Sequence, residues 1–596
     1  MRFGRHVDMT TVSRVYHLAL SCVIATHAGD TALAQEFTDV AEQAGIGYQH
    51  SGFMYIGGIA IADFDDDGFQ DIYVTTGEGH PNLLYLNDQD GTFAERASTS
   101  RIADMSEGWG AVAGDLDNDG DPDIYLTNYF SENQLFLNDG GGRFVTAVES
   151  GASDPGPSTS AALADYNNDG HLDIYVLNRS QAEDDYANAL LLSNGDGSFA
   201  DVTAWSGTGN RGTSLAVSSF DYDADGYQDI YIANEFELDA LYNNSRDGTF
   251  ANRAKELGLP HGAGMGVDFS DYDNDGDLDV YVSNLKRDFL LQNNGDGTFT
   301  DREDVGILND TMAWGVNFFD HDNDGDEDLY VVNGGMIWPK LYSEDNVFYL
   351  NNDDGTFTEV ARQMGIADGG DGRASACADF NNDGYADIFM INVARGRVRL
   401  YRNNNSGNNW LTVRLVGTSS NRNGIGATVT IEAGNSTQIR EVSAGASYAS
   451  MHSIDQQFGL SRSSLVDRAT VRWPSGTVQE LTNVGVNQTL VIVEPLHTAV
   501  SDGDTPRTPV VFRLSQNHPN PFNAATSIEF LTPKAGPVSL VIYDLKGSPL
   551  KRLVAGRRDA GRHVVLWDAS GVASGVYIYK LEAGRFTQTR KMALLK

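Results

Sequence analysis

The chain has 596 residues, with 41 basic and 83 acidic side chains and a formal net charge of −42. This acidity, without clusters of Lys or Arg, excludes a protein that binds nucleic acid through the phosphates. The length exceeds that of one ordinary domain, and a hydrophobic content of 41% is enough for several cores.

Residues 1–34 are predicted to be a secretory signal peptide. Three arginines precede a short apolar run, and "ALA" before Gln35 fits a cleavage site. A lipoprotein signal at "LALSC" is the alternative, which Ala19 disfavours. Later stretches are too short and too polar for a transmembrane helix, so we expect none. Since Cys22 lies in the leader, Cys377 is the one thiol of the mature chain, and we expect it in the core.

Residues 36–405 repeat the pattern D-x-[DN]-x-D-G-x-x-D seven times, at intervals of 49 to 59 residues. Oxygen-bearing side chains at positions 1, 3, 5 and 9, with a glycine turn at position 6, suit Ca²⁺, which takes six to eight oxygen ligands. An EF-hand is excluded because position 12 is a strand residue such as Val74 and not Glu. A single copy could be a turn without metal, since Asp, Asn and Gly favour turns, but seven copies in register argue against this interpretation.

The sequence therefore predicts up to seven Ca²⁺ ions, held by the side chains at these four positions of each copy. They are Asp63, Asp65, Asp67 and Asp71; Asp115, Asp117, Asp119 and Asp123; Asp165, Asn167, Asp169 and Asp173; Asp221, Asp223, Asp225 and Asp229; Asp271, Asp273, Asp275 and Asp279; Asp320, Asp322, Asp324 and Asp328; and Asp379, Asn381, Asp383 and Asp387.

Each repeat predicts four strands, because alternating apolar residues are separated by Asp-Gly turns. The fourth strand is missing after the last metal loop. A copy lies at the other end: residues 37–46 match residues 357–366 at seven of ten positions. Residues 36–46 are therefore expected to close the last blade of a seven-bladed β-propeller, which leaves no exposed sheet edge. An open solenoid is the alternative.

These repeats resemble the FG-GAP or VCBS family, whose calcium-loop blades also form the propellers of integrin α-subunits. The resemblance covers about residues 36–405. It implies calcium in the loop between the first and second strands of every blade, on one face of the disc, and a role in adhesion or binding.

Two tryptophans are predicted to mark a ligand-binding rim. Six residues before each leading aspartate the side chains diversify and include Trp109 and Trp314, whereas the next position is always small. We expect the inner strands to reach an open rim there, opposite the calcium loops, with both indoles free to stack on sugars or anchor a protein loop. The alternative is that both tryptophans plug the channel.

Residues 408–494 contain "NRNGIGATVTI", "QQFGL" and "VRWPSG" and resemble the ASPIC/UnbV domain that follows such propellers in the cartilage acidic protein family. The segment "GASYASMHSIDQQFGL" departs from that pattern, which leaves its role as a ligand site open. Residues 495–509 are expected to be a linker.

Residues 510–596 predict a small Ig-like β domain. "NPFN", "VIYDLKG", "SGVYIYKL" and a basic last strand resemble the type IX secretion C-terminal sorting domain, which implies contact with that machinery. An ordinary Ig-like domain kept in the mature protein is the alternative. Either places the protein outside the cell.

The sequence contains no recognisable set of catalytic residues, and its clustered aspartates are assigned to calcium. The expected fold is all-β: a calcium-binding propeller followed by two small β-sandwich-like domains. The expected function is a secreted or cell-surface, non-catalytic binding or adhesion module for extracellular glycans or proteins. The alternative is an extracellular polysaccharide-acting enzyme with its site in the propeller funnel.

Overall fold

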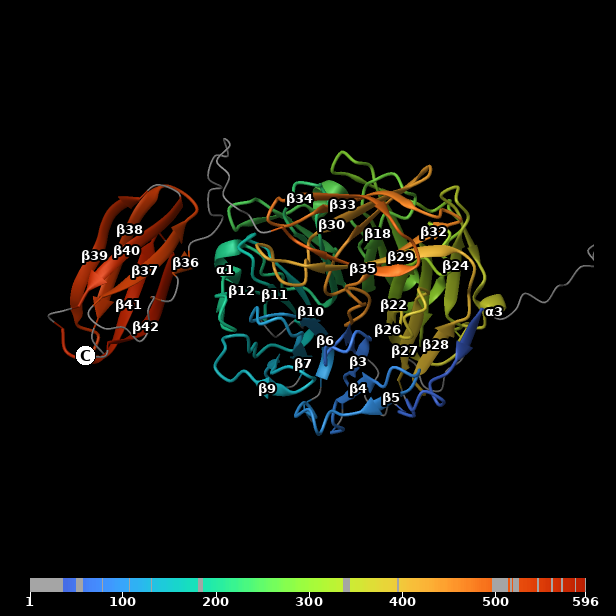
Figure 1. Ribbon diagram of the computed structural model, residues 1–596, viewed down its shortest axis with the longest axis horizontal. Helices are drawn as coiled ribbons and strands as arrows, with labels where there is room; N and C mark the ends of the chain where they lie inside the picture. The colour runs from blue at the N-terminus through green and yellow to red at the C-terminus, as the bar shows by residue number, and fades with distance from the viewer. Residues whose placement is uncertain are drawn as a thin grey trace, which may run out of the picture.

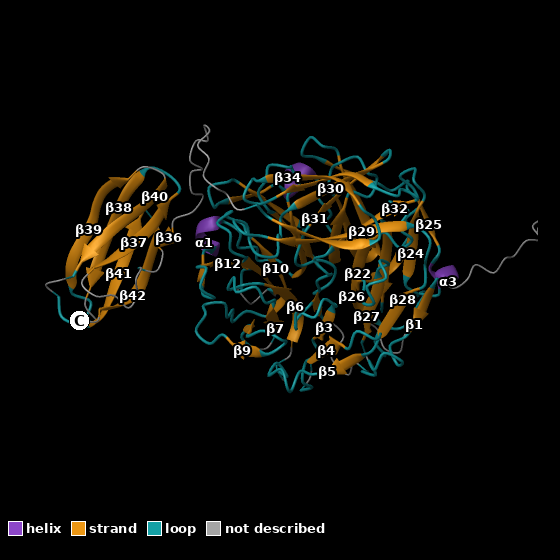
Figure 2. Ribbon diagram, viewed as in Figure 1, coloured by secondary structure: helices purple, strands orange, loops and turns teal. Residues whose placement is uncertain are grey.

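The computed structural model is an all-β structure (Figures 1 and 2). It describes residues 36–49, 57–335, 344–495 and most of 513–594, apart from short gaps at 78, 105, 107, 130, 181–185 and 394–395. The predicted signal peptide and nearly all of the predicted linker lie outside these residues. The described helices are single turns: α1 (Thr203–Ser206), α2 (Ala254–Leu257) and α3 (Ala361–Met364). None of them is long and apolar enough to cross a membrane.

Residues 37–403 form antiparallel four-stranded blades of one design. The innermost strands are β2 (Ile59–Ala62), β6 (Gly108–Gly114), β10 (Ser158–Ala164), β14 (Ser214–Phe220), β18 (Gly264–Ser270), β22 (Asp310–Phe319) and β26 (Gly372–Ala378). The second strands, each beginning at position 9 of a metal loop, are β3 (Asp71–Val74), β7 (Asp123–Asn128), β11 (Asp173–Asn178), β15 (Asp229–Asn234), β19 (Asp279–Arg287), β23 (Asp328–Asn333) and β27 (Asp387–Asn392).

The two outer strands of each blade are equally regular. The third strands are β4 (Leu83–Asn87), β8 (Gln134–Asn138), β12 (Ala189–Ser193), β16 (Ala240–Asn244), β20 (Phe289–Asn293), β24 (Val347–Asn351) and β28 (Arg399–Asn403). The fourth strands, each beginning with Phe, are β5 (Phe93–Glu95), β9 (Phe144–Thr146), β13 (Phe199–Asp201), β17 (Phe250–Asn252), β21 (Phe299–Asp301), β25 (Phe357–Glu359) and β1 (Phe37–Asp39).

The blades form a closed ring. β1 pairs antiparallel with β28, with Phe37 opposite Asn403, so the first strand of the chain completes the last blade. Each innermost strand neighbours the next around the axis, and β26 neighbours β2. β19 also pairs with β22, which joins two adjacent blades into one sheet. The all-β propeller architecture predicted from the sequence is thus confirmed, and the open solenoid is not formed.

Residues 409–493 form a domain that we call the cap, which lies across one end of the ring (Figure 1). One sheet has the order β32 (Gln456–Ser461), β29 (Asn409–Val416) and β35 (Gln488–Val493). The other has the order β31 (Ser436–Glu441), β30 (Thr428–Ala433), β33 (Val466–Arg472) and β34 (Val478–Val484). Apolar side chains of the cap and of the first three blades belong to one continuous core.

The last domain is a β-sandwich of two sheets. The smaller sheet contains β36 (Arg513–Leu514), β37 (Ala525–Thr532) and β40 (Gly561–Asp568). The larger contains β39 (Pro549–Arg558), β38 (Gly536–Tyr543), β41 (Gly575–Ala583) and β42 (Phe586–Leu594). The two sheets enclose a core of their own around Phe530 and Tyr579, which agrees with the expected small β-sandwich.

The propeller channel is filled by the axial segment, residues 444–451 of the cap, all of which are buried. Its backbone adds to the innermost strands: Ala444 O accepts from Leu163 N at 2.8 Å, and Ser447 N donates to Val267 O at 2.7 Å. The channel is therefore a core shared by two domains and not an open funnel.

The open rim predicted at Trp109 and Trp314 is wrong. The two indoles are 3% and 0% exposed, because Tyr448 of the axial segment reaches the axis between them. Trp109 Nε1 donates to Tyr448 Oη at 3.0 Å, and the ring centroids of Trp314 and Tyr448 are 5.0 Å apart. The guanidinium of Arg373 stacks over Trp314, with its Cζ 4.2 Å from the ring centroid. The tryptophans plug the channel, as the alternative interpretation held.

Replacing Tyr448 by Ala should lower the free energy of unfolding of the ring and cap by about 3–5 kcal/mol, because it empties a packed site on the axis. Tyr448→Phe keeps the ring and loses one hydrogen bond, at a cost of about 1 kcal/mol. Chemical denaturation of both variants measures the difference. Equal stability of Tyr448→Ala and the parent would contradict this account of the axis.

Candidate metal centres

Each candidate metal loop joins an innermost strand to the second strand of its blade. At position 1 the side chain folds back on its own loop: Asp63 Oδ1 accepts from Asp67 N at 3.0 Å, and Oδ2 accepts from Gly68 N at 2.8 Å. The same two bonds form in all seven loops. The position-6 glycines have φ between +85° and +110°, which residues with a side chain rarely adopt. The pattern D-x-x-x-D-G therefore builds the turn itself.

The position-9 aspartate ties each loop to its sheet. Asp71 Oδ2 accepts from Phe64 N at 2.8 Å, and its Oδ1 accepts from Asn87 N, at the end of the third strand, at 2.7 Å. The six other loops repeat both contacts. All seven of these aspartates are buried. Position 9 is thus structural as well as a candidate ligand.

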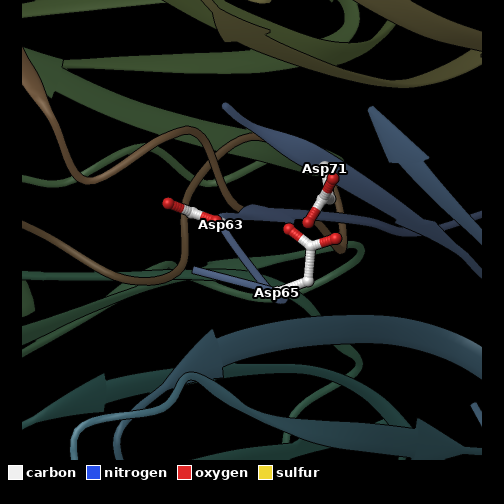
Figure 3. Close-up of side chains that lie close together, drawn as sticks. All are labelled: Asp63, Asp65 and Asp71. Carbon is white, nitrogen blue, oxygen red and sulfur yellow. The ribbon is translucent and has the colours of Figure 1, made fainter. Parts of the chain in front are cut away.

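Side-chain oxygens at position 3 complete the candidate centres. In five loops, three carboxylates offer oxygen atoms within 4.8 Å of one another: positions 1, 3 and 9 in the loops that start at Asp63, Asp115 and Asp271, and positions 1, 3 and 5 in those that start at Asp221 and Asp320. Figure 3 shows Asp65 and Asp71 pointing toward each other beside Asp63. In the two remaining loops position 3 is Asn167 or Asn381, and their described acidic groups do not form such a cluster of three.

Three of the position-3 oxygens are buried without a hydrogen-bond partner. They are Asp65 Oδ1, Asn167 Oδ1 and Asp273 Oδ1. A buried polar oxygen without a partner costs free energy, so such atoms need an explanation, of which an ion is one. Three loops thus share, at the same position, an oxygen that could ligate a cation.

The electrostatics of the loops also suit a cation site. Burial raises the pKa of Asp63 and Asp115 to about 6, with neighbouring carboxylates adding a smaller increase. At position 9, burial raises the pKa of Asp71 and Asp123 to about 8. Carboxylates that are costly to ionise in the folded protein become easy to ionise beside a divalent cation.

Sequence reasoning missed the residue at position 4, which links neighbouring loops. Five asparagines there donate through Nδ2 to the carbonyl oxygen of the position-6 glycine in the next loop, at 2.9–3.4 Å. They are Asn118, Asn168, Asn274, Asn323 and Asn382. Position 4 has positive φ in every loop, which Asn tolerates. The signal was present in the sequence, since Asn recurs at this place.

A second set of missed asparagines joins the blades. The third strand ends in Asn in six blades, and its Nδ2 donates to the position-2 carbonyl of the preceding blade; Asn138, for example, bonds to Phe64 O at 2.9 Å. The exception is Ser193, whose side chain is too short to reach. This recurrence was also visible in the sequence.

The cap covers the loops with polar contacts. Asn423 Oδ1 accepts from Asp115 N at 2.7 Å, and Gln457 Nε2 donates to Gly384 O at 2.6 Å. Arg440 forms a buried ion pair with Glu327 at 2.7 Å, next to a position-9 aspartate. The candidate metal centres are therefore held between the ring and the cap.

Three family models match the chain. The FG-GAP-like repeat model matches residues 63–126, 115–176, 180–232, 221–282, 271–331 and 337–390. The ASPIC and UnbV model matches residues 417–499, and the secretion system C-terminal sorting domain model matches residues 517–594. The sorting domain indicates a secreted or cell-surface protein.

Among curated proteins, cartilage acidic protein 1 of Xenopus tropicalis is 27% identical over 195 residues, which are 30% of this chain. The chain spans 28% of that relative's length. Similar solved structures include an Agrocybe aegerita lectin that recognises non-reducing terminal N-acetylglucosamine, with 20% identity and a TM-score of 0.37 over 59% of this chain and 88% of the lectin. PorZ, a type IX secretion component of Porphyromonas gingivalis, has 13% identity and a TM-score of 0.24 over 90% of this chain and 75% of PorZ.

At these scores neither solved structure bears on function. The repeat model, in contrast, covers more than half of the chain, and its matches coincide with the blades and their aspartate loops. The protein therefore belongs to the FG-GAP-like repeat family and combines these repeats with an ASPIC and UnbV domain and a secretion system C-terminal sorting domain.

Proposed function

We propose that the protein is a secreted, calcium-stabilised binding module. The observation that carries the proposal is the recurrence of the same oxygen-lined loop around the ring, with a buried unpartnered oxygen at position 3 in three of the loops. Carboxylate and amide oxygens fit Ca²⁺ better than softer metals. The side chains at positions 1, 3, 5 and 9 would hold the ion, which supplies charge compensation to the crowded carboxylates and no redox or hydrolytic step.

The domain types and the filled channel fit a binding role better than catalysis. FG-GAP propellers and ASPIC/UnbV domains are mainly non-catalytic binding modules, and we assign this protein to that class, with an extracellular glycan or protein as its ligand. The alternative of a polysaccharide-acting enzyme placed its site in the funnel. That space is filled by the buried axial segment, residues 444–451, so the structure offers no support for it.

The buried histidine of the ring also fits a structural role. His321 lies between Asp328, at 2.5 Å from Nδ1, and Glu36, at 3.1 Å from Nε2. Burial lowers its pKa, but the two carboxylates outweigh that effect and raise it to about 11. The imidazole is thus held as a cation between the two carboxylates.

Features near both ends of the chain support a proposed route of export. We propose that residues 1–34 are a cleaved signal peptide that directs the chain across the inner membrane. Residues 510–596 would then be recognised by the type IX secretion machinery, which the sorting-domain match supports. The mature protein would be delivered to the cell surface or the medium.

Chelation should destabilise the protein. A ligand present at 100 times its dissociation constant contributes about 2.7 kcal/mol per site, so losing several ions should lower the melting temperature strongly. Asp65→Ala, which alters one loop, should cost no more than about one such increment. Calorimetry with EDTA, and after calcium is restored, measures both. A melting temperature unchanged by EDTA would refute the proposal.

Calcium stabilisation should grow with pH between about 5 and 8. The pKa of Asp63 is raised to about 6 and that of Asp271 to about 7, so protons compete with the cation below these values. Without calcium, the folded state binds more protons than the unfolded state, so stability should fall as pH rises from about 4 to 8. Melting curves across this range, with and without EDTA, should diverge as pH rises; parallel curves would contradict the prediction.

Deleting residues 510–596 should trap the protein in the periplasm while its melting temperature stays calcium-dependent. Fractionation of cells locates the truncated protein. As a matched gain of function, the same residues fused to a periplasmic reporter should carry it to the surface. Surface delivery of the truncated protein would show that this domain is not the sorting signal.

A further inference from the structure

The ring of loop-to-loop hydrogen bonds has two breaks. Five position-4 asparagines bond to the next loop, but the corresponding residues Asp66 and Ala224 carry no amide donor. The carbonyls that they would reach belong to Gly120 and Gly276. Asp66 has φ of 59° and Ala224 has φ of 53°, in the same range as the five asparagines. The loop backbone is therefore the same at the two breaks, and only the bridging side chain is missing.

A cavity opens at the second break. It has a volume of about 580 Å³ and is lined by residues 224–227 and 276–278 of two adjacent metal loops and by β30, β31, β33 and β34 of the cap. We call it the loop cleft. Its volume lies within the range of about 300–1,000 Å³ that is usual for small-ligand sites. At five of the other six junctions an asparagine spans the two loops.

The loop cleft presents several carboxylate and carbonyl acceptors. Asp225, Asp277 and Glu441 line it, and Glu441 is a buried carboxylate whose contacts are amide N–H donors: Gln228 Nε2 at 3.0 Å and Asp221 N at 3.2 Å. The carbonyl of Gly276 adds a further acceptor where the bridging asparagine is absent. A ligand of this cleft can therefore donate to these oxygens and also accept from the guanidinium of Arg472, which lines the same cavity.

The remaining lining adds apolar surface and hydroxyl groups. Tyr227 of the ring and Pro474 of the cap are both half-buried and both line the cleft, so the face of a sugar ring has apolar partners. Thr428 and Thr430 of β30 offer hydroxyls that both donate and accept. Hydroxyl-rich, uncharged ligands match this combination, whereas a polyamine would leave the threonine and tyrosine groups unused.

We propose that the loop cleft binds a neutral sugar unit of an extracellular glycan. The proposal rests on the proposed binding function and gives it a location, at the junction of two metal loops and away from the filled channel. Sugar hydroxyls would donate to Asp277, Glu441 and the Gly276 carbonyl. One ring would pack between Tyr227 and Pro474.

Ala224→Asn tests the site directly. The new amide should donate to Gly276 O, as each of the five asparagines donates to the glycine of its own next loop, and so bridge the cleft. The loop fold should stay intact, because Asn adopts the positive φ more readily than Ala. Asp66→Asn restores the bridge at the other break, where the loop cleft is absent, and is the matched control. Tyr227→Ala removes the aromatic face without altering a candidate metal ligand.

The probes are maltohexaose, cellohexaose, laminarihexaose and mannohexaose, titrated by calorimetry into the calcium-saturated mature protein. At least one should bind the parent. Ala224→Asn and Tyr227→Ala should weaken that binding about tenfold or more, the loss of one good contact, while Asp66→Asn should leave it unchanged. Binding by none of the four, or undiminished binding by Ala224→Asn, would overturn the proposal.

Two further measurements separate the possible failures. If the melting temperature of the same samples responds to EDTA while no hexasaccharide binds, the loop cleft assignment fails and the calcium-stabilised module stands. If EDTA has no effect, the proposed function itself fails. Titration with hexalysine covers a cationic partner: binding of hexalysine that Ala224→Asn abolishes, without sugar binding, would assign the cleft to a peptide and overturn the sugar proposal.

Discussion

The buried aspartate at the start of every second strand is the contact on which the rest of the propeller depends. Its two oxygens accept backbone N–H groups from the metal loop and from the end of the third strand, so one side chain fixes loop and sheet together. A carboxylate in this position is costly to bury, and three more oxygen-bearing side chains crowd around it. The fold therefore concentrates negative charge at one end of a disc and needs compensation there.

The cap compensates part of this negative charge. It places amide and guanidinium groups over the loops, as with Gln457 and Arg440, and sends residues 444–451 down the axis. Because cap and blades share one core, removing either would expose apolar side chains that the other covers. Part of the domain that the family models separate from the repeats, residues 444–451, therefore lies inside the propeller.

Most of the fold could be predicted from the sequence because it is periodic. The Asp-Gly pattern marks every loop, and the match of residues 37–46 to residues 357–366 predicts the strand that pairs with β28. Tyr448 could not be predicted, since it occurs once and acts across more than three hundred residues to bury Trp109. The asparagines at position 4 were readable from the period, but their partners lie in the next repeat, a contact that becomes apparent only when the ring is seen closed.

The pairing of β1 with β28 sets the order in which the ring can be completed. Phe37 and Asn403 lie at opposite ends of the repeats, so during synthesis the first strand emerges long before its partner. Contacts this distant along the chain form slowly, because the intervening loop must first be closed. Until then, the last blade has an open edge and the channel has no occupant. The native ring is therefore a late product of folding, completed only after the final blade and the axial segment are both available.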